Sequence, residues 1–281
     1  MKKIQELHNL QNLQIEIKDD FDLEKIISCG QCFRAKSLEG GMFRFVTGDH
    51  VLYIKRTGDN SYSVSCSDDE WKNIWTEYFD LNRSYSSIYY EEHKKHDYVR
   101  KAMDCGRGIR ILRQDPWEML VTFIISQRKS IPAIMGSVEA LADKYGHPIE
   151  TEYGTVNSFP TADEMAHASV DDLKKCSLGY RAPYIYDAVQ RVISGSLDLH
   201  AIADYDDEEL FRELQTVQGV GKKVANCICL FGYGRIARVP VDVWIARAVE
   251  EDCCGKDPFL LFGNNAGIIQ QYIFYYKKWG S

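Results

Sequence analysis

The stretch LQTVQGVGKKVANCICLFGYGRIARVPVD, residues 214–242, decides how this chain folds. Residues 206–217 carry apolar side chains at helical spacing behind an acidic start, as expected for the positive end of a helix. The sequence Gln-Gly-Val-Gly at 218–221 interrupts that period, because glycine permits backbone angles that a side chain would forbid. Helical spacing resumes over 224–228. The sequence therefore predicts a helix, a glycine hairpin and a second helix.

This hairpin suits a nucleic-acid backbone. A turn with Gly219 and Gly221 that leads into a helix presents backbone N–H groups at the positive helix end, where a phosphate binds well. Lys223 and Cys227 lie four residues apart and so share a face of the second helix. The neighbouring charge of Lys222 and the helix end both favour a free amine on Lys223, as a nucleophilic lysine requires.

Neither half of this pattern is specific alone. A Gly-x-Gly-Lys-Lys turn also occurs at plain helix junctions, and an aspartate such as Asp242 before an apolar helix is usually only an N-cap. The conjunction of Gly-Val-Gly-x-Lys at 219–223 with Val-Pro-Val-Asp at 239–242 is more informative. It resembles the signature of the helix-hairpin-helix DNA glycosylases, which combine a hairpin, a lysine nucleophile and a following aspartate.

Composition sets broad limits. A chain of 281 residues with 45% hydrophobic and 27% charged residues is typical of a globular protein with a proper core. Its net charge of −7 argues against a general polyanion binder but leaves room for a local basic face. The N-terminal sequence has a basic start without an apolar secretory segment, and no run approaches the length of a membrane span. We expect a cytoplasmic protein, associated with the nucleoid in a prokaryote.

The nine cysteines fit a reducing compartment. Cys29-Gly-Gln-Cys32 could be redox-active or bind metal, but no second C-x-x-C motif completes a zinc site and no βαβ pattern surrounds it. We expect neither metal nor cofactor.

The fold class expected is α+β, with an N-terminal antiparallel sheet domain at 1–103 and a mainly helical region at 104–281. Residues 43–46 and 51–55 are rich in β-forming side chains around a turn, and a further strand is expected within 61–66. The helical region is expected to begin a buried helix at Asp-Pro-Trp-Glu, 115–118, where an N-cap acid, a proline and a glutamate fall in order. Later expectations are a helix after the interruption at 127–130, a helix after Asp242, and a closing helix at 266–278.

Several further blocks narrow the resemblance. They are Gly-Gln-x-Phe-Arg at 30–34, the segment 108–118, Leu-Gly-Tyr-Arg at 178–181, and the hairpin blocks at 219–230 and 239–243. Together, and in this order, they resemble the eukaryotic-type branch of the 8-oxoguanine DNA glycosylase/lyase family. The likeness implies a bifunctional enzyme, a DNA N-glycosylase with lyase activity at abasic sites, that acts as a monomer on double-stranded DNA containing 8-oxoguanine.

The resemblance also implies roles for individual residues. Lys223 matches the lysine that attacks C1′ of the damaged nucleotide, and Asp242 matches the aspartate that assists it. Gly30 matches the glycine whose carbonyl accepts a hydrogen bond from N7–H of 8-oxoguanine. Cys227 and Phe274 match the pair that sandwiches the flipped base, and Gln270 matches the residue that reads its Watson–Crick edge. Residues expected to bind DNA are Gln127, Arg128, Tyr180, Arg181, Gly219, Gly221, Lys222 and Trp244.

The spacing of Gln270 and Phe274 independently puts an amide and a ring on one helix face, as a flipped base requires. Such a pair is nevertheless more often simple packing.

The sequence also departs from the family pattern. Arg128 stands where the family has the asparagine that fills the vacated base stack, although Gln127 beside it could serve instead. Ala133 replaces an arginine that grips the opposite cytosine, while Tyr180 and Arg181 are kept as wedge and second cytosine contact. Losing one guanidinium removes a set of donors suited to one base. We therefore expect relaxed discrimination for cytosine opposite the lesion.

Absent features separate the related classes. Only Cys253 and Cys254 follow the catalytic region, so the four-cysteine iron–sulfur loop of endonuclease III-type enzymes is not expected. An alkylbase glycosylase would lack the hairpin lysine. A non-catalytic helix-hairpin-helix DNA-binding module explains the hairpin, but not Lys223, Asp242, Gln270 and Phe274 together. A cation held by carbonyl groups in the hairpin stays open at this point.

Overall fold

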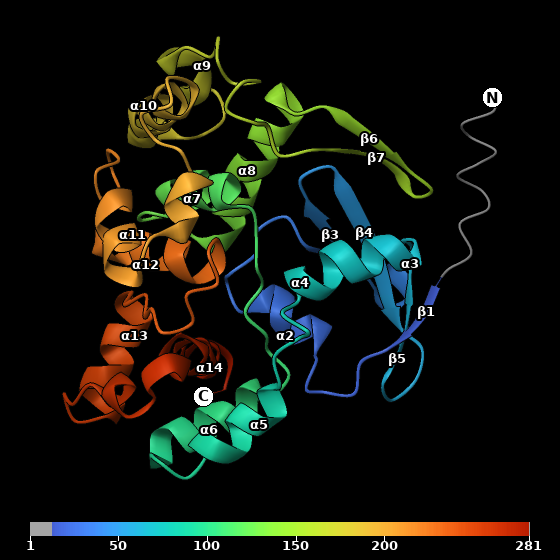
Figure 1. Cartoon of the computed structure of the whole chain (residues 1–281), viewed down its shortest axis with the longest axis vertical. Coiled ribbons are helices and arrows are strands. Elements are labelled where there is room, and N and C mark those ends of the chain that lie inside the picture. The colour runs from blue at the N-terminus through green and yellow to red at the C-terminus, as the bar shows by residue number, and fades with distance from the viewer. Residues whose placement is uncertain (1–12, 281) are drawn as a thin grey trace.

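The computed structural model describes residues 13–280, and Figure 1 shows its elements from blue at the N-terminus to red at the C-terminus. The expectation that the N-terminus lacks a secretory segment falls largely on residues 1–12, outside the described part of the chain. No helix within residues 13–280 combines the length and the apolar character needed to cross a membrane.

An antiparallel sheet of five strands forms the N-terminal part, as predicted. Its strand order is β1-β5-β4-β3-β2. The predicted hairpin is confirmed, with Thr47 opposite His50 and the turn at Gly48 and Asp49. The strands are β1 (Leu13–Glu16), β2 (Lys36–Leu38), β3 (Met42–Thr47), β4 (His50–Arg56) and β5 (Ser61–Val64). A separate two-stranded sheet joins β6 (Pro148–Thr151) and β7 (Gly154–Asn157).

Aromatic side chains fill the core beneath the five-stranded sheet. Trp75 is fully buried and lies beside Tyr78 and Phe79, which also contact Phe45 of β3. Such edge-to-face pairs add to the free energy gained from burying apolar area. The segment that carries these residues is not one regular helix. It consists of α3 (Asp68–Glu70), a π-helical turn (Trp71–Trp75) and α4 (Thr76–Tyr78).

Helices form most of the rest of the described chain, which confirms the predicted α+β class. The predicted start of α7 is confirmed: Pro116 is its first residue, and the Asp115 carboxylate accepts a hydrogen bond from the Glu118 N–H at 2.8 Å. The helices are α2 (Leu23–Ser28), α5 (Tyr85–Glu92), α6 (Asp97–Gly106), α7 (Pro116–Ile125), α8 (Ile131–Tyr145), α9 (Val170–Lys174), α10 (Ala182–Ile193), α11 (Asp207–Leu214), α12 (Lys222–Phe231), α13 (Val243–Arg247) and α14 (Ala266–Trp279). Short 3₁₀ or π turns cover 39–41, 179–181, 201–204, 248–252, 258–261 and 263–265.

The helical core gathers elements from distant parts of the sequence. Helix α14 packs mainly against α6, and α12 packs against α7, which is buried from Glu118 to Ile125. In Figure 1 the red α14 lies close to the blue α2, so the last helix meets the loop that follows the first one. Helix α6 runs across residues 103 and 104, where the sequence suggested a domain boundary, and that division stays a prediction. This packing places the loop at Gly30 against α14.

Candidate active site

The hairpin between α11 and α12 has the predicted form. Gly219 adopts φ +83°, and a Cβ at this position would lie 2.5 Å from Cδ2 of the Tyr184 ring. Only glycine fits here, since both the backbone angle and the ring exclude a side chain. Gly221 differs from the expectation, because it caps α12 with φ −89° and a Cβ on this residue would have no atom within 4 Å. Glycine at position 221 therefore leaves open space in front of the helix, and the backbone angle does not require it.

Lys223 projects from the first turn of α12 toward α7. Its Nζ donates to Ser126 Oγ at 3.5 Å and lies 5.2 Å from the centre of the Phe123 ring. Cys227, one turn further along α12, is buried, and burial raises the pKa of its thiol while the nearby Lys223 ammonium opposes that rise. The expected shared face of Lys223 and Cys227 is thus confirmed.

Asp242 begins α13 and caps it. Its Oδ1 accepts from the N–H groups of Trp244 at 3.0 Å and Ile245 at 2.9 Å. Helix α13 packs against α14, and the Asp242 carboxylate influences the pKa values of Cys227 in α12 and of Lys278 in α14. Asp242 is therefore both an N-cap, as its sequence context suggested, and a charge within the site.

Two of the residues expected to hold a flipped base, Gly30 and Phe274, lie against each other. Gly30 adopts φ +76°, and a Cβ on it would lie only 3.0 Å from Cε1 of Phe274 and 3.4 Å from Cδ1 of Ile131. Glycine is needed there so that the backbone can approach the ring. Within residues 13–280 no hydrogen bond is donated to the Gly30 carbonyl.

The two adjacent glutamines of α14 are used differently. Gln271 is buried and donates to the Cys29 carbonyl at 3.2 Å, so it joins the last helix to the end of α2. Gln270 is 4% exposed, yet its Oε1 has no hydrogen-bond partner among the described residues. A buried amide oxygen without a partner costs free energy, and such an atom in a native protein is typical of a site for a polar ligand.

The loop between α7 and α8 (residues 126–130) is held at both ends. The Gln127 amide donates to the carbonyl of Gly219 at 3.0 Å, which ties this loop to the hairpin. Arg181 is 7% exposed and donates to the carbonyl oxygens of Gln127 and Leu178. Arg128 itself is exposed and adopts φ +51°. In this structure Arg181 therefore braces the loop, and Arg128 projects from it.

Two of the residues expected to bind DNA are aromatic and lie on the surface. The Tyr180 side chain is 53% exposed, and the Arg181 guanidinium lies 4.3 Å from the centre of its ring. Trp244 is 36% exposed in the first turn of α13, and Lys222 is exposed in the first turn of α12. These side chains are therefore accessible to a binding partner.

Known proteins resemble this chain along most of its length. The family model for the 8-oxoguanine DNA glycosylase N-terminal domain matches residues 13–120, and that for the HhH-GPD superfamily of base excision DNA repair proteins matches residues 121–257. The structure of MBOgg1 with a low-affinity DNA ligand is 37% identical in sequence, with a TM-score of 0.90 over 94% of both chains. The chain belongs to the 8-oxoguanine DNA glycosylase family.

Two other relatives extend the comparison with this family. The 8-oxoguanine glycosylase/lyase of Clostridium acetobutylicum is 35% identical in its apo form, with a TM-score of 0.89 over 95% of this chain and 96% of that one. It has also been solved with double-stranded DNA containing cytosine opposite 8-oxoguanine. A yeast N-glycosylase/DNA lyase is 34% identical over 158 residues, which is 52% of this chain and only 42% of the yeast protein.

One residue near these candidates was not singled out from the sequence, Lys278. It follows Gln270 and Phe274 at the same four-residue spacing on α14, and its Nζ lies 5.7 Å from the centre of the Phe274 ring. The spacing was visible in the sequence, but a lysine near the end of a helix usually interacts only with the helix dipole.

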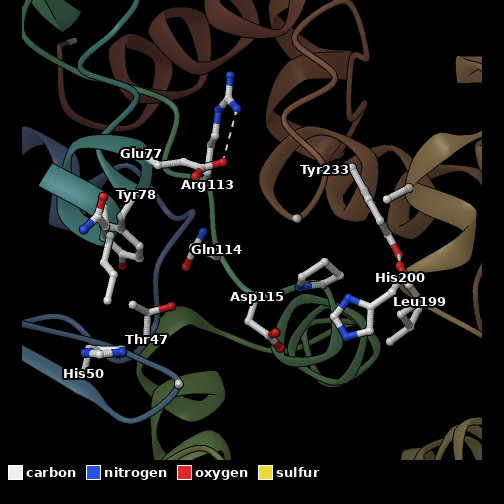
Figure 2. Close-up of a pocket in the computed structure, with 16 residues that line it drawn as sticks. Thr47, His50, Glu77, Tyr78, Arg113, Gln114, Asp115, Leu199, His200 and Tyr233 are labelled. Atoms are coloured by element: carbon white, nitrogen blue, oxygen red, sulfur yellow. Dashed lines mark hydrogen bonds and ion pairs between the residues drawn. The ribbon is translucent and has the colours of Figure 1, made fainter. Parts of the chain in front are cut away.

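The glycosylase also has a cavity of about 540 Å³ away from these residues. Figure 2 shows the Asp115 and His200 side chains facing each other in it and Arg113 beside Glu77. None of the candidate site residues lines this cavity. It lies at the N-terminal end of α7, whereas Ser126 and the loop that carries Arg128 follow the C-terminal end.

Proposed function

We propose that this glycosylase removes 8-oxoguanine from double-stranded DNA and then cleaves the strand at the resulting abasic site. The observation that supports the proposal most is that the Lys223 amine and the Asp242 carboxylate both act on Cys227. The contact between Gly30 and Phe274 and the unpartnered Gln270 oxygen among the described residues add to it. The relatives named as glycosylase/lyases, and the duplex in one of their structures, support the substrate class.

DNA binding begins at the hairpin. The open space in front of Gly221 and the free N–H groups at the start of α12 suit a phosphate, and Lys222 adds a positive charge. The lesion then leaves the base stack, at a cost of roughly a few kcal/mol that a damaged base lowers. We propose that Arg128 fills the vacated position, because the amide of Gln127 already binds the hairpin carbonyl.

Recognition follows in the pocket between Gly30 and α14. Phe274 stacks on the flipped base opposite Cys227, and the Gly30 carbonyl accepts from the N7–H that distinguishes 8-oxoguanine from guanine. The Gln270 amide reads the opposite edge of the base, which satisfies its buried oxygen. A site built to accept a hydrogen bond rejects a base that lacks the donor, because the acceptor is then left buried and unpaired.

Chemistry then takes place at C1′. The free amine of Lys223 attacks C1′ and the base leaves with the electron pair of the glycosidic bond, while the Asp242 carboxylate stabilises positive charge that develops on the sugar. The sugar ring opens to give an imine between Lys223 and C1′. Such a Schiff base permits β-elimination of the 3′ phosphate, so one lysine serves both activities.

Borohydride trapping tests this mechanism. With a duplex containing 8-oxoguanine, the wild-type protein should form a covalent complex, and Lys223→Gln should abolish both trapping and base release. Lys222→Gln is the matched control, since it removes the adjacent charge and should weaken binding while trapping persists. A complex that survives Lys223→Gln and disappears in Lys222→Gln would refute the assignment.

The base opposite the lesion is expected to matter less than in the eukaryotic-type enzymes. Ala133 supplies no guanidinium, and the Arg181 donors are directed at the carbonyls of Gln127 and Leu178. Cleavage of duplexes with each of the four opposing bases should show a shallow preference for cytosine. A preference as steep as that of the eukaryotic-type enzyme would overturn this part of the proposal.

A further inference from the structure

Lys278 extends the face of α14 that holds Gln270 and Phe274. The three residues are spaced by four, so an amide, a ring and an amine follow one another along one helix face. Each step along the helix is about 6 Å, which is close to the distance from a base to its own sugar and phosphate. A base that stacks on Phe274 therefore leaves its sugar within reach of either end of this row.

The groups around Lys278 indicate that the sugar would lie at the Lys278 end of this row. The Asp242 carboxylate, which belongs beside the sugar in the proposed mechanism, acts on the Lys278 ammonium, and Asp242 also acts on Cys227 beside Lys223. The Lys278 Nζ lies 5.7 Å from the centre of the Phe274 ring and 5.0 Å from that of Trp279. Lys278 thus lies near the base-stacking ring and within the electrostatic influence of the Asp242 carboxylate.

The neighbouring lysine behaves differently. Lys277 pairs with Glu251 at 2.8 Å and Asp252 at 2.7 Å, and these contacts raise the pKa of its amine. Burial lowers the pKa of Lys278, and this effect outweighs the opposing influence of the two groups that face it, the Cys29 thiol from α2 and the Asp242 carboxylate from α13. Burial also raises the pKa of Cys29 to about 12, so that thiol remains neutral. Of the two adjacent amines, Lys278 is therefore the better suited to accept a proton.

We propose that Lys278 is the base of the strand-cleavage step, a role that rests on the proposed function and adds a second catalytic amine to it. Once Lys223 is joined to C1′ as an imine, the neutral Lys278 amine removes a proton from C2′. The electron pair of that C–H bond forms the C2′–C3′ double bond, the C3′–O3′ bond breaks, and the 3′ phosphate leaves with its electron pair. Lys278 later returns its proton to solvent, and no oxidant or reductant takes part.

Two rates measured on one duplex separate this step from base release. Total product after hot alkali reports the glycosylase step, and product without alkali reports strand cleavage by the protein. Lys278→Gln should lower the ratio of the cleavage rate to the glycosylase rate at least tenfold relative to wild type. The borohydride-trapped complex should persist, because its imine forms on Lys223. Lys277→Gln, the charge-matched control, should keep the wild-type ratio of the two rates.

Lys278→Arg and a pH profile test the proton transfer itself. Arginine stays protonated, so Lys278→Arg should not restore cleavage. If Lys278 only bound a phosphate, arginine would restore the cleavage rate. The wild-type cleavage rate should rise with pH as the Lys278 amine loses its proton, and Lys278→Gln should flatten that rise. An unchanged ratio of rates in Lys278→Gln, or full rescue by arginine, would overturn the inference. Absence of any trapped complex with the wild-type protein would instead overturn the proposed function.

Discussion

Arg128 holds its backbone in the left-handed region, at φ +51°, without being a glycine. This conformation costs an ordinary residue roughly 1 kcal/mol, and such strain is typical of functional sites. Three contacts maintain it, since Gln127, Arg181 and Lys129 all fasten the loop on either side of it. The chain thus accepts strain at the residue that we expect to enter the DNA.

Arg128→Gly should therefore stabilise the protein while damaging its activity. Removing the strain should raise the free energy of unfolding by about 0.5–1 kcal/mol, measured with urea, because glycine adopts this angle freely. Excision from duplex DNA should fall at least tenfold. Cys254→Gly is a matched control, since Cys254 is also exposed with φ +55° but lies outside the site. Retained activity in Arg128→Gly would show that Arg128 does not fill the vacated stack.

Glu118 gives a second prediction at the scale of one residue. It is fully enclosed in α7, and burial raises the pKa of its carboxyl to about 7, although the Arg34 guanidinium opposes this. A carboxyl with a raised pKa in the folded state destabilises the fold only when it must ionise. That penalty is absent below about pH 4.5, grows up to about pH 7, and is constant above.

Glu118→Gln should therefore stabilise the protein at pH 8 and have little effect near pH 4.5. The gain at pH 8 should be on the order of 3 kcal/mol, since the pKa rises from 4.5 to about 7 and one pKa unit corresponds to about 1.4 kcal/mol. Urea unfolding at both pH values measures the difference. An equal effect of the substitution at the two pH values would show that Glu118 does not titrate in this range.

At the scale of elements, Gly219 and Gly221 have different roles in the hairpin between α11 and α12. Gly219→Ala should destabilise the fold by about 1–3 kcal/mol, because it forces a side chain into a left-handed angle and against the Tyr184 ring. Gly221→Ala should cost at most about 1 kcal/mol, from its N-cap position, yet weaken DNA binding at least tenfold by blocking the approach of the phosphate. Urea unfolding and a DNA-binding titration on both variants measure these effects. Equal losses of stability in the two would contradict this division.

Elements that depend on neighbouring residues were predictable from sequence, and contacts between distant segments were not. The cap at Asp115, the turn at Gly48 and Asp49, and the helix that starts after Gly221 each follow from a few adjacent residues. The contact of Gly30 with Phe274 came only from the family resemblance, because spacing says nothing about segments so far apart. The bracing of Gln127 by Arg181 and the burial of Glu118 had no signal in the sequence, since each depends on how helices pack.

For the whole molecule, charge distribution matters more than net charge. The chain carries −7, yet Lys222 and Arg128 are both exposed near the hairpin. Phosphate contacts release counterions, so affinity for a duplex should fall steeply with salt. Lys222→Gln should reduce the slope of log K against log salt by about 1, measured between 50 and 200 mM salt. An unchanged slope would place Lys222 away from the DNA backbone.

The contact between Gly30 and Phe274 has a consequence for the order in which parts of the protein fold. Contacts between near neighbours close small loops and form early, whereas this contact joins segments from opposite ends of the described chain. The hairpin joins two consecutive helices, so it can form before the pocket does. A partly folded molecule with this hairpin but without the pocket would bind a duplex and have no site for a flipped base. DNA binding would therefore arise during folding before the enzymatic activity does.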